Sequence, residues 1–78
     1  MSKALCPEEV IKAYNKKVVE YLLQFGTYEL TVDGRILKTE IDRYDRDGKP
    51  DGFVGWWDDD HSVMTFGRTP YEVYNDSF

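Results

Sequence analysis

An amphipathic helical pattern near the N-terminus restricts the possible folds of this chain most strongly. Apolar side chains recur there at intervals of three or four residues: Ile11, Tyr14, Val18, Leu22 and Phe25. This spacing places them on one face of a helix. Pro7, followed by two glutamates, suits the first turn, and Gly26 suits a left-handed residue after the last turn. We therefore predict a helix from Pro7 to Phe25, with Cys6 as a poor N-cap.

Two segments with alternating apolar and polar residues follow this helix, at residues 27–32 and 35–42. The Asp-Gly pair at 33–34 joins them, and a type I′ turn favours this pair because both central residues need positive φ. The resulting register places Glu29 opposite Lys38, two side chains of opposite charge. The pattern predicts a hairpin with a defined register.

Residues 52–57 and 62–67 predict a second hairpin, with Asp59 and Asp60 at its tip. In this register one face carries Phe53, Trp57, Met64 and Phe66. The other face carries Val54, Trp56, Val63 and Thr65. Since the helix covers only one face, the second needs another cover.

The last segment predicts a short helical turn. Thr69 and Glu72 have the spacing of a capping box, so a turn should run to about Tyr74. We expect Tyr71, Tyr74 or Phe78 to cover the second face of the sheet. The fold class is thus α+β: an N-terminal helix packed on a four-stranded antiparallel β-meander, with a short C-terminal helical turn, in one domain spanning residues 1–78.

Charge and composition limit the classes of function. The net charge is −5, and residues 42–78 carry all of it, with nine acids and four bases. An acidic half repels nucleic-acid backbones, so we expect no direct nucleic-acid binding; it would attract a basic protein surface or a divalent cation. No apolar run is long enough for a membrane span, no signal peptide is evident, and the single cysteine excludes an internal disulfide. These features predict a cytoplasmic protein.

Four aspartates with two glycines resemble a calcium-binding loop: Asp42, Asp45, Asp47 and Asp51. If Gly48 takes the sixth position of such a loop, Arg43 falls on the first and Val54 on the twelfth, where acids are needed. The simpler interpretation is an ordinary hairpin connection rich in turn-forming residues. Calcium binding remains an alternative function.

Three aspartates precede the only histidine, His61, and this sequence offers metal-ligand or acid–base chemistry. Consecutive aspartates at a hairpin tip point apart, however, so a solvated turn is the simpler interpretation. Cys6 has no base nearby in the sequence to activate it. We predict no enzyme activity, no cofactor and no metal site.

Trp56 and Trp57 are neighbours in a predicted strand, so they point to opposite faces. One belongs to the core, and the other lies under the C-terminal segment or is exposed as an anchor for a partner.

The leading hypothesis is therefore a non-enzymatic protein-binding module, an acidic inhibitor of the phage-encoded type that occupies a basic surface of a host protein. If that surface normally holds nucleic acid, the module would be a DNA mimic. The predicted partner-binding residues are Asp58, Asp59, Asp60, Trp56, Tyr44, Asp45 and Asp47. A second alternative, besides calcium binding, is a structural homodimer that buries the face formed by Val54, Trp56 and Val63.

Overall fold

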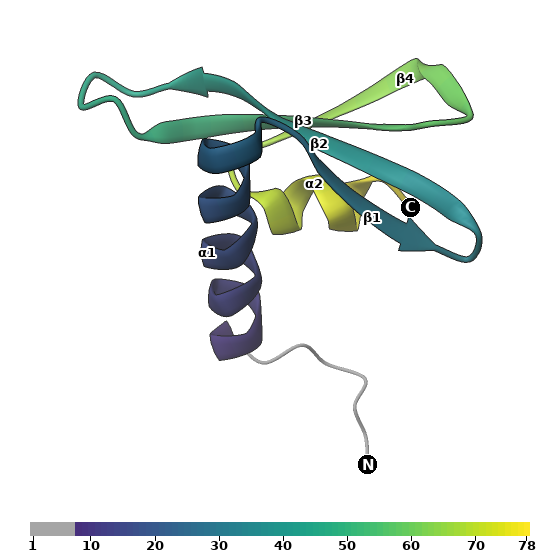
Figure 1. The fold of residues 1–78 in the computed structure, drawn as a ribbon, viewed down its shortest axis with the longest axis horizontal. Coiled ribbons are helices and arrows are strands. Elements are labelled where there is room, and N and C mark those ends of the chain that lie inside the picture. Colours follow the sequence, from purple (N-terminus) through teal and green to yellow (C-terminus); the bar gives the residue numbers. More distant parts are fainter. Residues whose placement is uncertain (1–7) are drawn as a thin grey trace.

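The computed structural model describes residues 8–78. Its elements are α1 (Glu8–Phe25), β1 (Tyr28–Val32), β2 (Arg35–Tyr44), β3 (Pro50–Trp57), β4 (Asp60–Gly67) and α2 (Pro70–Asp76). The strands form one antiparallel sheet in the order β1-β2-β3-β4 (Figure 1). The predicted α+β fold is confirmed. The expected helix start at Pro7 and the cap at Cys6 lie outside the described residues.

The β1–β2 hairpin has the predicted register. Asp33 and Gly34 both have positive φ, at 52° and 80°, as a type I′ turn requires. Glu29 lies opposite Lys38, and their charged groups approach to 3.8 Å. Local turn chemistry was enough to fix this pairing.

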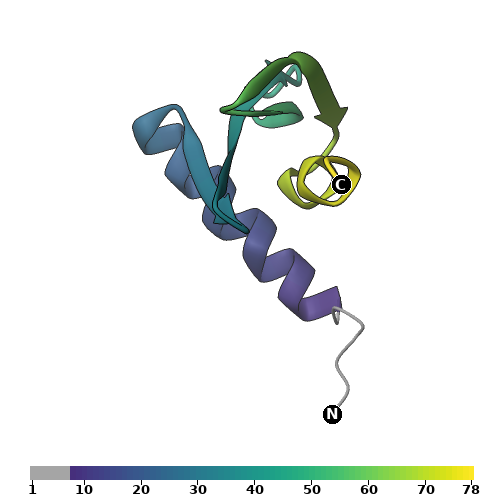
Figure 2. The same ribbon diagram turned by 90° about the vertical axis from the view of Figure 1, so that its right-hand side faces the viewer.

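Both helices pack against the same face of the sheet, called the helix face below (Figure 2). The core there joins both helices to β3 and consists of Val18, Leu22, Phe53 and Val73. Thr69 caps α2 through its side chain, as predicted. The expectation that the C-terminal segment covers the opposite face is wrong, because Tyr71 and Tyr74 of α2 pack against Tyr14 of α1.

The predicted register of the second hairpin is wrong, by one residue at Phe53 and by two residues in the opposite direction at Trp57, because the pairing is irregular between Gly55 and Trp57. Phe53 pairs with Gly67 instead of Phe66, and Trp57 pairs with Asp60, so that Asp58 and Asp59 form the tip. The Asp58 amide donates to the carbonyl of Ile36 at 2.8 Å, which ties the turn to β2. Since a shift of one residue moves a side chain to the other face, Phe53 is buried and Phe66 is exposed.

Candidate functional site

The face of the sheet opposite the helices carries exposed apolar side chains, and we call it the outer face. Val54 lies opposite Phe66, and strand alternation places Trp56 and Met64 on the same face. These four residues form the outer patch. Phe66 is 60% exposed and Met64 49%, whereas Val54 is buried beneath them. The sequence placed Met64 and Phe66 on the face of Phe53 and Trp57, so their position beside Val54 and Trp56 was missed.

Charged residues of β1 and β2 border the outer patch. Glu40 lies opposite Val54, and Lys38 lies opposite Trp56. The Lys38 ammonium contacts the carboxylate of Asp58 at 3.2 Å as well as that of Glu29. The patch therefore has a charged border in which acids outnumber bases.

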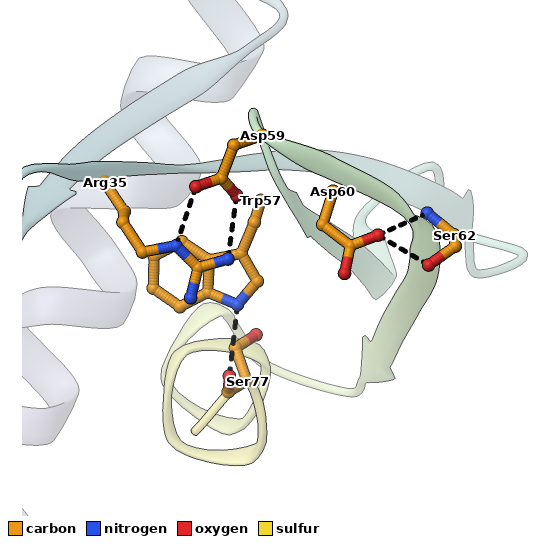
Figure 3. A network of polar contacts seen from close by, with 6 residues as sticks. All are labelled: Arg35, Trp57, Asp59, Asp60, Ser62 and Ser77. Atoms are coloured by element: carbon orange, nitrogen blue, oxygen red, sulfur yellow. Dashed lines mark hydrogen bonds and ion pairs between the residues drawn. The ribbon is translucent and has the colours of Figure 1, made fainter.

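The hairpin tip is held by an arginine that sequence analysis did not single out. Arg35 donates from Nε and Nη2 to the two carboxylate oxygens of Asp59, at 3.0 and 2.7 Å (Figure 3). Its guanidinium also lies 4.2 Å from the ring centre of Trp57. The hydrogen bonds from Arg35 lower the pKa of Asp59, and those to Asp59 raise the pKa of Arg35. No local pattern links residues 24 positions apart, so only the fold reveals this clamp.

The two tryptophans occupy opposite faces, as expected. Trp57 lies on the helix face, where its Nε1 donates to the carbonyl of Ser77 at 3.2 Å and its ring meets Phe78 edge-on. Trp56 belongs to the outer patch. Both tryptophans are half-buried, so the expectation that one of them belongs to the core is wrong. Trp57 is thus the tryptophan that lies under the C-terminal segment.

Asp60 also has a partner within the chain. Its carboxylate accepts hydrogen bonds from the backbone amide and the hydroxyl of Ser62, and these bonds lower the pKa of Asp60 (Figure 3). With Asp58 bound to Lys38 and Asp59 bound to Arg35, each tip aspartate has a polar partner. The tip therefore presents oriented, partly neutralised carboxylates.

The predicted loop residues lie apart from the tip. The connection between β2 and β3, with Tyr44, Asp45 and Asp47, is at one end of β3, and the tip is at the other (Figure 1). The eight residues of β3 span roughly 26 Å. The seven predicted partner-binding residues therefore form two separate groups, and Trp56 belongs with the tip aspartates.

The loop uses its first aspartate to build a turn. The Asp45 carboxylate accepts hydrogen bonds from the amides of Asp47 and Lys49, at 2.8 and 2.9 Å. Gly48 has a φ of 82°, which favours glycine. Within residues 8–78, no group of three or more His, Cys, Asp or Glu side chains is arranged to hold a metal ion. The calcium hypothesis gains no support from this geometry.

The clamp between Arg35 and Asp59 should show in the acid sensitivity of the fold. Since the folded-state pKa of Asp59 is lowered, the clamp stabilises the protein above the ordinary aspartate pKa of about 3.9 and is lost as pH falls through the folded value. We expect Asp59→Asn to lose less stability than wild type on acidification, measured by thermal unfolding. The matched control is the Arg35→Gln background, in which Asp59→Asn should change the acid response little. Equal acid responses of wild type and Asp59→Asn would contradict the role of the clamp.

An open apolar groove of about 240 Å³ lies on the helix side of the sheet. Its lining comes from α1, β1 and α2: Val10, Ile11, Tyr14, Leu30, Tyr71 and Tyr74. Burial, with smaller contributions from Tyr28 and Tyr74, raises the pKa of Tyr14 to about 12. Tyr14 therefore stays protonated at neutral pH and is poorly suited to act as a general base.

Comparisons of the chain with protein-family models, curated proteins and solved structures found no match. Within the described part of the chain, no helix is long and apolar enough to cross a membrane.

Proposed function

We propose that the chain is a non-enzymatic protein-binding module that docks through its outer patch and the neighbouring tip aspartates. The observation that carries this proposal is the placement of both helices on one face, which leaves Met64 and Phe66 exposed on the other. Contiguous exposed apolar residues with a polar border are typical of protein interfaces. Trp56 is a suitable anchor, since tryptophan is enriched among the residues that dominate binding energy.

Charge supports a basic partner. The whole net charge of −5 lies in residues 42–78, and Glu40 and Asp58 border the patch. A small acidic domain on a basic surface would block whatever that surface otherwise binds, which is the basis for an inhibitor of the phage-encoded type. Because the tip carboxylates already have partners within the chain, the apolar patch makes the main contact in this proposal. Mimicry of nucleic-acid phosphates by the carboxylates is secondary.

A binding comparison with two sets of variants tests this proposal. Wild type, Met64→Ser/Phe66→Ser and Asp58→Asn/Asp59→Asn/Asp60→Asn are immobilised and exposed to nuclease-treated lysate of the source cells. A matched control is Leu23→Ser, which removes an exposed apolar side chain from α1. We expect wild type and the control to retain one partner, the patch variant to lose it, and the asparagine variant to bind it more weakly.

Repeating the binding comparison at low and high salt separates the contribution of charge from that of the apolar patch. We expect high salt to weaken binding of wild type and to have less effect on the asparagine variant, since screening acts on charge. If a partner still binds the patch variant but no longer binds the asparagine variant, the carboxylates make the main contact and the apolar patch does not. If wild type retains no partner at any salt concentration, the protein-binding proposal fails.

A further inference from the structure

A hollow of about 300 Å³ lies near the end of β3 that joins the connection to β2. The side chains around it include two arginines, an aspartate and an aromatic ring: Arg43, Arg68, Asp42 and Phe66. Its volume is at the lower limit for small-molecule pockets, in which a few polar groups typically lie beside an apolar wall. The hollow is therefore a candidate site for a small ligand.

Gly52 forms part of the lining and lets the side chain of Arg43 lie against the backbone of β3. The two residues are partners in the pairing of β2 with β3. A β-carbon at position 52 would lie 2.8 Å from both Cγ and Nε of Arg43. The φ of Gly52 is not positive, so the space that Arg43 occupies is the reason for a glycine at this position. The absence of a side chain at position 52 thus sets the position of Arg43 in the hollow.

The charged groups of the hollow are only partly paired within the chain. Arg68 contacts the carboxylate of Asp51 through one nitrogen, Nη2, at 3.3 Å. Within residues 8–78, neither the guanidinium of Arg43 nor the carboxylate of Asp42 has a hydrogen bond or an ion pair. A guanidinium has five donors, so both arginines have donors left for a ligand. The carboxylate of Asp42 is likewise available as an acceptor.

The balance of charge favours a zwitterion as the ligand. With Asp51 included, the hollow has two positive and two negative side chains and is close to neutral. A phosphate monoester would bring about two negative charges that this balance does not offset. An α-amino acid instead has a carboxylate, which a guanidinium binds through paired donors, and an ammonium group, which suits Asp42. Phe66 is 60% exposed and offers its ring to an aromatic side chain.

We propose that this hollow binds a free aromatic α-amino acid. Its carboxylate accepts hydrogen bonds from Arg43 and Arg68, its ammonium group contacts Asp42, and its ring packs against Phe66. A peptide has only one of the two charged groups at each terminus, so the free amino acid matches the lining better. The site does not depend on the proposed protein partner. Since Phe66 also belongs to the outer patch, a bound amino acid would compete with that partner.

Titration of the ¹⁵N-labelled protein with phenylalanine, followed by NMR, tests the proposal. We expect the amide signals of residues 42–43, 52 and 66–68 to shift and to saturate with a dissociation constant of about 1 mM or lower. Three analogues each lack one group: N-acetylphenylalanine the ammonium, phenethylamine the carboxylate and alanine the ring. Each should bind about tenfold more weakly or less well still, because one contact is lost. Inorganic phosphate should bind more weakly than phenylalanine.

Variants of the lining test the same contacts from the side of the protein. Arg43→Gln, Asp42→Asn and Gly52→Ala should each weaken phenylalanine binding by about tenfold, the last because its β-carbon displaces Arg43. Arg46→Gln, in the exposed connection between β2 and β3, is the matched control and should bind as wild type does. Circular dichroism and thermal unfolding establish that each variant is folded.

Three outcomes would overturn the proposal. The first is the absence of a saturable shift with phenylalanine, and the second is a set of shifts confined to residues outside the hollow. The third is equal binding of phenylalanine, N-acetylphenylalanine and phenethylamine, because the ring alone would then make the contact. None of these outcomes depends on whether a protein partner is retained from the lysate.

Discussion

Gly55→Ala is expected to destabilise the folded state by about 2–3 kcal/mol, at the upper end of the usual cost of overpacking. A β-carbon at position 55 would lie 2.4 Å from Cγ1 of Val73 and 3.2 Å from the carbonyl oxygen of Lys38. Val73 is fully buried between α2 and the sheet, so its side chain has little room to move. Urea unfolding of the two proteins measures the difference in free energy.

Val73→Ala supplies the matched control for this substitution. Alone, it should cost about 2 kcal/mol through lost burial and the resulting cavity. In the double variant the added methyl group fills part of that cavity, so the loss should fall short of the sum by at least about 1 kcal/mol. Strict additivity would contradict the close approach of Val73 to Gly55.

Leu22→Ala is expected to cost about 2–5 kcal/mol, the range for truncating a buried leucine. Leu22 is 3% exposed and belongs to the core that joins both helices to β3. A domain of this size has a stability of about 4–12 kcal/mol, so this variant approaches global unfolding at room temperature. Thermal and urea unfolding measure the loss.

Leu23, the next residue in the chain, provides the control for Leu22→Ala. Leu23 is 59% exposed on the same helix, so Leu23→Ala changes helix propensity as Leu22→Ala does but removes no core contact. We expect a change within about 0.5 kcal/mol. Similar losses of stability for Leu22→Ala and Leu23→Ala would mean that α1 does not pack against the sheet through the face that contains Leu22.

The proposals for function depend on the same packing. Because Val73 brings α2 under the sheet beside α1, no element of residues 8–78 covers the outer patch. The patch then remains available to other molecules.

The sequence by itself determined the features that depend on neighbouring residues. The apolar spacing of residues 11–25 requires a helix, and the Asp-Gly pair at 33–34 requires a turn that pairs β1 with β2 in one register. The capping box at Thr69 similarly required a short helix. Adjacent tryptophans in a strand had to point to opposite faces. In each case the physical cause acts within a few residues of the chain.

Only the tertiary structure decided which face remained exposed. Asp58 and Asp59 bond to β2, and these contacts hold the hairpin tip one residue earlier than predicted. The irregular pairing between Gly55 and Trp57 then places Phe66 on the outer face. Val73 fits against Gly55, which places α2 beside α1 instead of on the opposite side. The turn at residues 58–60 has no glycine to fix its position, and both faces of the hairpin are apolar. Interactions between neighbouring residues therefore left open both the register of the second hairpin and the position of α2. Contacts between segments distant in the sequence determined them.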